Sequence, residues 1–133
     1  MSRKIFVNLP VADLPAAMAF YSAIGFTNNP QFTDETAAGM VWSDDIYVML
    51  LTHEKWQSFT SRPLPPAGAS EVMLAISVDS IDEVHELNRV AEENGGQADV
   101  NPPEEYSFMF SRHFADPDGH VWSPFWMDLD AAG

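Results

Sequence analysis

Asp116-Pro117-Asp118-Gly119-His120 separates two strand-like segments near the end of the chain, and its residue types favour a tight turn. This turn closes the second of two similar halves. A shift of 67 residues keeps the helix caps and the apolar stripes of the two halves in phase, which favours duplication of one small unit. The shift places Val11 on Val78, Asp13 on Ser80, Leu14 on Ile81, Ala17 on Val84 and Phe20 on Leu87.

The first half predicts a strand over residues 5–9 followed by a helix. Asp13 is a typical N-cap, apolar residues then recur at helical spacing, and Gly25 is placed to end the helix in a left-handed turn. Apolar and β-branched runs predict further strands over residues 26–32, 37–43 and 46–52.

The second half has the same order. Residues 72–78 predict a strand, Ser80 and Glu83 form the pattern of a capping box, and Gly95-Gly96 ends the helix that follows. Strands are expected over residues 97–100, 107–115 and 120–127. Each half therefore has the predicted order β-α-β-β-β.

The chain of 133 residues, 46% of them hydrophobic, is long enough for one well-packed domain. We expect a single domain over residues 1–133, with module one at 1–52 and module two at 71–128. Residues 53–70 contain three prolines and a glycine after Arg62, so they are predicted to connect the modules.

Twenty acidic and six basic residues give a formal net charge of −14, which would repel the phosphates of nucleic acid. Residues 1–66 hold six acidic and four basic residues, whereas residues 67–133 hold 14 and two. Solvated helix and loop faces or a cation-binding surface would each explain this imbalance. A small molecule or another protein is the expected partner.

The absence of cysteine excludes disulfides, thiolate metal sites and a cysteine nucleophile. There is no early basic stretch joined to an apolar run, and no run approaches the ~20 apolar residues that span a bilayer. We therefore expect a cytoplasmic protein that does not bind membranes.

Several of these motifs together resemble the vicinal oxygen chelate superfamily, which includes glyoxalases, bleomycin and fosfomycin resistance proteins and extradiol dioxygenases. The resemblance rests on Val11-Ala12-Asp13-Leu14, the pair Phe20-Tyr21, Gly25-Phe26 and the turn over residues 116–120. It implies an α+β fold of two paired βαβββ modules, whose curled mixed sheets form a cup. It also implies a homodimer.

The resemblance further implies where metal-dependent relatives place their ligands. In this sequence those positions carry Phe6, Met73 and Ser123, and Met49 or Leu50 stands at a fourth. Divalent transition metals need imidazole or carboxylate ligands, so no metal and no other cofactor is expected. Glu71 is either a displaced ligand or a lone carboxylate at the rim.

Without a metal, the resemblance predicts a mostly apolar ligand pocket with few polar groups. Asn8 either binds the ligand or hydrogen-bonds to neighbouring backbone. His113 either exchanges a proton with the ligand or has a structural role. The predicted lining consists of Phe6, Asn8, Leu50, Glu71, Met73, His113, Ser123 and Phe125.

These observations favour a metal-independent protein that binds a small apolar or aromatic ligand, as bleomycin resistance proteins do. The alternative is a glyoxalase-like lyase or isomerase with a non-standard active site that uses His113 or Glu71. A third reading is an interaction protein whose own side chains, such as Phe6, Met73 and Phe125, fill the cup.

Overall fold

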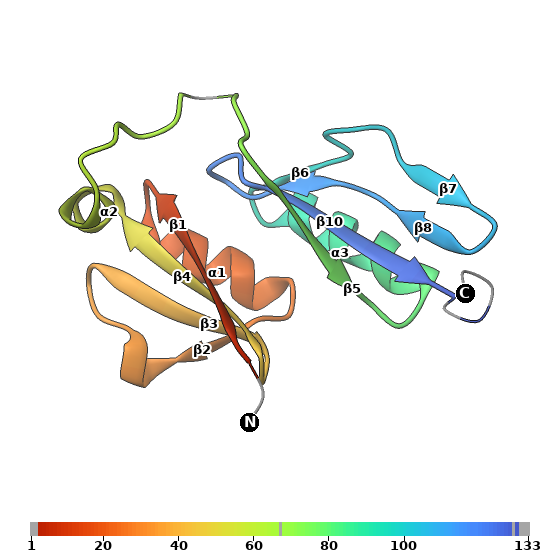
Figure 1. Ribbon diagram of the computed structural model, residues 1–133, viewed down its shortest axis with the longest axis horizontal. Coiled ribbons are helices and arrows are strands. Elements are labelled where there is room, and N and C mark those ends of the chain that lie inside the picture. Colours follow the sequence, from red (N-terminus) through yellow and green to blue (C-terminus); the bar gives the residue numbers. More distant parts are fainter. Residues whose placement is uncertain (1–2, 67, 129, 131–133) are drawn as a thin grey trace. The chain divides into compact units, whose positions relative to one another are not determined.

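The computed structural model describes residues 3–66, 68–128 and 130 of the chain. Contacts between residues divide the chain into two units, residues 1–67 (unit 1) and residues 68–133 (unit 2) (Figure 1). The boundary falls inside the segment 53–70, where prolines are concentrated.

Unit 1 contains a four-stranded sheet in the order β1-β4-β3-β2, in which only the β1–β4 pair is parallel. Pro30 ends β2 early, so the predicted strand over residues 26–32 is shorter than expected and continues as a 3₁₀ turn. The elements are β1 (Ile5–Val11), α1 (Leu14–Ala23), β2 (Thr27–Asn29), η1 (Pro30–Phe32), β3 (Ala37–Ser43), β4 (Ile46–Thr52) and α2 (His53–Phe59).

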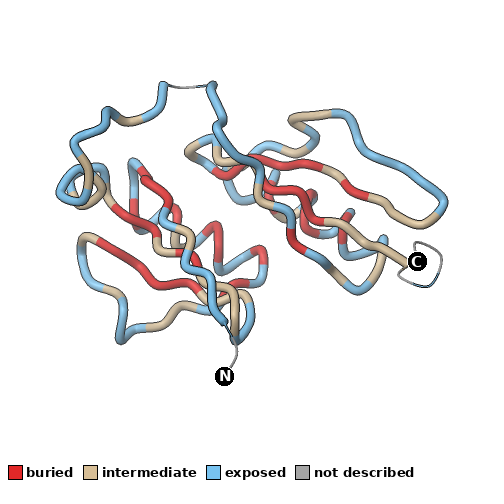
Figure 2. The backbone as a smooth tube through the Cα atoms, in the orientation of Figure 1, coloured by how far each residue is buried: buried red, intermediate tan, exposed pale blue. Residues whose placement is uncertain are grey.

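Helix α1 covers one face of this sheet, and its ends form as the sequence predicts. Asp13 caps the helix by accepting a hydrogen bond from the backbone nitrogen of Ala16 at 3.1 Å, and Gly25 follows it with a φ of +118°. Buried residues run through β3 and β4 beneath the helix (Figure 2). The hydrophobic core of unit 1 includes Leu9, Val11, Phe20, Tyr21, Met40, Val48 and Leu50.

The segment that we expected to be a connector begins with a helix. Thr52 caps α2 by accepting a hydrogen bond from the backbone nitrogen of Lys55 at 3.2 Å. Irregular backbone begins only after Phe59, where Pro63, Pro65 and Pro66 prevent a regular element.

Unit 2 repeats the parallel pairing of the first and last strands, here β5 with β10. Strand β10 also pairs with β8 and β9, and the remaining order is β6-β9-β10-β8-β7. The elements are β5 (Met73–Ser77), α3 (Ile81–Glu93), β6 (Gln97–Ala98), β7 (Glu104–Tyr106), β8 (Met109–Ser111), β9 (Phe114–Ala115) and β10 (Val121–Met127).

Helix α3 packs on one face of this sheet, above Phe114 and Trp122, which are 0% and 2% exposed. Trp122 pairs with Phe114, so both lie on the same face of the sheet. Ser80 caps α3 through the backbone nitrogen of Glu83 at 3.1 Å. Ile81 is 40% exposed, because the first turn of the helix lies at its exposed end.

The predicted strand over residues 107–115 differs most from the structure. It is interrupted at Arg112 and His113, and its first part pairs with a strand that the sequence did not predict, β7. The α+β class and the two strand-helix-strand repeats are as predicted. Within the described part of the chain, no helix is both long and apolar enough to cross a membrane.

Candidate functional site

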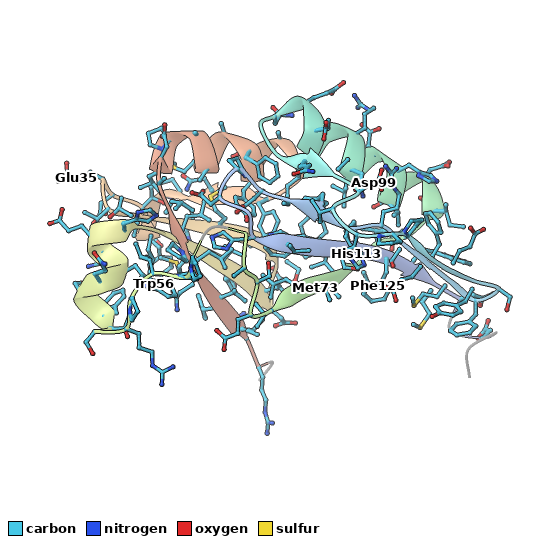
Figure 3. The ribbon with its side chains drawn as sticks, turned by 90° about the horizontal axis from the view of Figure 1, so that it is seen from above. Glu35, Trp56, Met73, Asp99, His113 and Phe125 are labelled. Atoms are coloured by element: carbon cyan, nitrogen blue, oxygen red, sulfur yellow. The ribbon has the colours of Figure 1, made fainter. Side chains whose placement is uncertain are left out.

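The sheet face of unit 2 that lies opposite α3 carries most of the predicted site residues of this unit; we call it the open face of unit 2. Strand register arranges its residues in rows, because paired residues point to the same side of a sheet. One row contains Met73, Val121 and Ala115, and another contains Ser77, Phe125, Ser111 and Glu104. Figure 3 shows Met73, His113 and Phe125 on this side of the sheet.

His113 is the centre of a hydrogen-bonded network on this face. Its Nε2 lies 3.0 Å from Oε1 of Glu104, and its Nδ1 lies 2.9 Å from Nδ2 of Asn101. The hydroxyl of Ser111 donates to the same Glu104 oxygen at 3.3 Å. The network also touches the predicted lining, since Nδ2 of Asn101 lies 3.7 Å from the sulfur of Met73.

Burial differs sharply along this network. His113 is 6% exposed and Ser111 is 1% exposed, whereas the side chain of Glu104 is 46% exposed. The Asn101 amide donates to Nδ1, so the neutral tautomer with its proton on Nε2 satisfies both ring nitrogens. Both ring nitrogens of His113 are therefore already engaged within the network. A catalytic role for His113 stays a prediction.

Arg112 and His113 hold the same loop from opposite faces of the sheet. Arg112 lies on the helix side, where it donates to both carboxylate oxygens of Asp99, at 2.9 and 2.7 Å, and to Nδ1 of His85 at 2.9 Å. The hydrogen bonds from Arg112 hold the pKa of Asp99 below its ordinary value. On the open face, the ring of His113 contacts Asn101 through Nδ1, and the backbone nitrogen of Val100 also donates to the carbonyl of His113 at 3.1 Å.

Unit 1 also has a sheet face opposite its helix, and two predicted lining residues lie on it. Phe6 is 51% exposed and stacks on Tyr47 with 4.5 Å between ring centroids. Asn8 is exposed and pairs in register with Met49. Phe6 and Asn8 thus share one sheet face, as their spacing predicts.

Two predicted lining residues need correction. Leu50 is fully buried and pairs with Leu9, so alternation places it beneath α1 and not on the face of Phe6 and Asn8. Met49 occupies that face in its place. Glu71 is exposed and lies two residues before β5, which begins at Met73, so it is outside the strand.

Ser123 and Phe125 lie on the open face of unit 2, where Ser123 is 8% exposed and Phe125 is half-buried. The sequence did not single out Asn101, Glu104 or Ser111. Pairing between β7 and β8 brings Glu104 beside Ser111, and the turn at Ser107 and Phe108 carries none of the residues that signal a hairpin.

Comparison with known proteins identifies the family. The family model of the Glyoxalase/Bleomycin resistance protein/Dioxygenase superfamily matches residues 5–123. This chain belongs to that superfamily. The members of this superfamily share the vicinal oxygen chelate fold that the motifs predicted. The comparison with curated proteins returned no match.

Several solved structures have the same fold. A hypothetical protein from S. aureus is 29% identical, with a TM-score of 0.78 and coverage of 95% of each chain. A family enzyme from Burkholderia phytofirmans is 20% identical, with a TM-score of 0.77 and coverage of 95% of this chain and 99% of its own. A fosfomycin resistance protein from Mesorhizobium loti is 16% identical, with a TM-score of 0.66 and coverage of 99% and 95%.

The side chains at the superfamily's metal-ligand positions do not fit a transition metal. Phe6 offers no donor atom, Met73 offers a thioether and Ser123 a neutral hydroxyl. Among the residues that the structure describes, no three His, Asp or Glu side chains lie close enough to hold a metal ion.

Proposed function

We propose that this chain binds a small, largely apolar molecule on the open face of unit 2 without the aid of a metal ion. The observation that carries the proposal is the half-exposed carboxylate of Glu104. Two buried side chains, His113 and Ser111, donate hydrogen bonds to it. Apolar groups stand near it on the same face, since Phe125 pairs with Ser111 and Tyr106 is two residues away.

Burial of polar side chains supports a binding role. A buried imidazole and hydroxyl reduce stability unless they are hydrogen-bonded, and here both are committed to holding one surface carboxylate. Small-molecule sites typically combine an apolar lining with a few fixed polar groups. Met73 and Tyr106, 58% and 56% exposed, supply apolar surface that water covers in the free protein.

Metal independence is proposed from donor chemistry. The network on this face has one imidazole and one carboxylate, and the two nitrogens of the imidazole are already hydrogen-bonded. A site for zinc or a related ion needs three or four such ligands. The expected result of metal analysis after dialysis is less than one transition ion per chain.

A thermal-shift screen against a metabolite library tests the binding function. A ligand at about 100 times its Kd stabilises the folded state by about 2.7 kcal/mol, so binding is measured as a rise in Tm. Met73→Ala should reduce the shift, whereas Val72→Ala should leave it unchanged. Val72 is a matched control because it is equally exposed, at 58%, and lies outside β5. Equal ligand-induced rises in Tm for Met73→Ala and Val72→Ala would show that the ligand does not bind on the open face of unit 2 at Met73.

Glu104 also supports the alternative of a glyoxalase-like lyase or isomerase. A fixed carboxylate beside a histidine can accept a proton from a bound substrate. Turnover of methylglyoxal hemithioacetal, with Ni, Zn, Mn or Fe added in turn, tests this activity. Turnover that Glu104→Gln abolishes would favour the enzyme over the binding protein.

A further inference from the structure

We infer that the ligand of this face carries a cationic nitrogen, such as a primary ammonium or an amidinium, beside an apolar body, and that Glu104 receives the cation. This inference rests on the proposed function and names its ligand class. It starts from the two oxygens of one carboxylate. Oε1 of Glu104 accepts from His113 and Ser111, and Oε2 has no hydrogen-bond partner among the residues that the structure describes.

Apart from His113, which contacts only Oε1, Glu104 has no partner among the described residues of its own unit that can carry a positive charge. Residues 67–133 contain only two Lys or Arg residues, Arg89 and Arg112. Arg89 is paired with Glu86 and Glu93 on α3, with 2.7 Å between Nη1 and the Glu93 carboxylate. Arg112 is paired with Asp99 at 2.7 Å on the opposite face of the sheet. The carboxylate of Glu104 is therefore left for a cation from outside.

The surrounding charge favours the same ligand class. The 14 acidic residues of this half exceed its two basic residues, so its net charge attracts cations and repels anions. A neutral donor such as an alcohol would satisfy one hydrogen bond but gain nothing from this field. A cationic nitrogen gains both the hydrogen bond and the attraction of the negative charge, and a hydrogen bond between charged partners is stronger than a neutral one.

The apolar part of the ligand has a defined place beside Glu104. Phe125, Ser111 and Glu104 lie in one row across three strands, and Met109 and Tyr106 form part of the next row. Neighbouring residues in such rows lie about 5 Å apart, so Phe125 is about 10 Å from Glu104 and the small Ser111 lies between them. A two- or three-atom linker between an ammonium and a ring spans about 5 Å, so the ring is expected to lie over Ser111 and to contact the near edge of Phe125.

Asn101 and His113 act as positioning residues in this site. Asn101 fixes the imidazole through Nδ1, and the imidazole fixes Oε1 of Glu104, so Oε2 faces the ligand. Because the support comes from buried groups, Glu104 loses less rotamer freedom on binding than an unsupported surface glutamate.

The test uses three probes that differ in charge: 2-phenylethylammonium, 2-phenylethanol and 3-phenylpropionate. Affinities for the full chain are measured by NMR titration. The ammonium should bind at least about fivefold more tightly than the alcohol, as expected for a partly exposed charge pair, and the propionate most weakly. Glu104→Gln should abolish the preference for the ammonium. Glu105→Gln should preserve it, because the neighbouring Glu105 pairs with Phe110 on the helix side.

His113 variants separate positioning from general folding. His113→Gln keeps a donor for Glu104 and should retain the ammonium preference, whereas His113→Leu removes that donor and should reduce the preference. Equal affinities for ammonium and alcohol, or the same loss in Glu104→Gln and Glu105→Gln, would overturn the cation inference while the binding function stands. If none of the three probes shifts resonances of this face, the cation inference is wrong, and the thermal-shift screen alone then decides the proposed function.

Discussion

Replacing Asp116 by alanine should destabilise the fold more than the loss of an exposed helix-cap carboxylate does. Asp116 is 3% exposed, and its Oδ1 accepts hydrogen bonds from the backbone nitrogens of Asp118 and His120 at 2.9 and 2.8 Å. Each such bond to a charged group contributes about 1.5 to 3 kcal/mol. Water can reach the freed donors in this partly exposed turn, so the expected loss is roughly 3 kcal/mol.

Urea unfolding followed by circular dichroism measures this loss. With a slope of about 2 kcal/mol per molar urea, the midpoint should fall by about 1.5 M. Asp116→Asn keeps the acceptor oxygen without its charge and should lose about half as much. Asp13→Ala is the matched comparison: this exposed helix cap accepts one backbone hydrogen bond, and its loss costs about 1 kcal/mol. Equal midpoints for Asp116→Ala and Asp13→Ala would refute the reasoning.

Three further predictions concern an ion pair, a buried strand residue and a helix cap. Arg112→Ala should lower the free energy of unfolding by about 1 kcal/mol at neutral pH, since the side chain of Asp99 is 50% exposed. Because the pKa of Asp99 is lowered, the ion pair stabilises the fold at pH values above 3.8, the ordinary value for Asp. This contribution is lost as the pH falls below 3.8 and through the lowered pKa. A difference in unfolding free energy between wild type and variant that persists at about pH 2 would contradict this. Leu50→Ala should lower the free energy of unfolding by about 3 kcal/mol because the side chain is fully buried, whereas Met49→Ala should lower it by under about 1 kcal/mol. Calorimetry of the two variants measures both losses. Ser80→Ala should cost about 1 kcal/mol through loss of the α3 cap, and an unchanged Tm would rule out that role.

Much of the fold was predictable because its signals are local. Asp13, Ser80 and Gly25 occupy the cap positions that their chemistry predicts, and strands β3 and β4 match the predicted ranges. The predicted strands are wrong where contacts between residues distant in sequence determine the backbone conformation. Residues 107–115 read as one strand, yet Arg112 and His113 interrupt it because both side chains bind a loop that lies before it in sequence.

The site was predictable only in part. Spacing and family resemblance placed Met73, Ser123 and Phe125 correctly on one sheet face, since strand parity follows directly from the sequence. Glu104 and Asn101 could not be found in this way. Neither belongs to a motif, and each reaches His113 only through the fold of an unpredicted hairpin and the loop before it.

Arg112 and His113 bind the loop over residues 99–101 from opposite sides, and this has a consequence for ligand exchange. Asp99, which holds a φ of +54°, is tied down on the helix side, and Asn101 is tied down on the other. A swing of this segment away from the sheet must break both attachments together, so it does not behave as a hinged flap. Exchange of the proposed ligand is therefore expected to proceed without an opening of residues 99–101, with association rates that vary little with solvent viscosity beyond the diffusional effect.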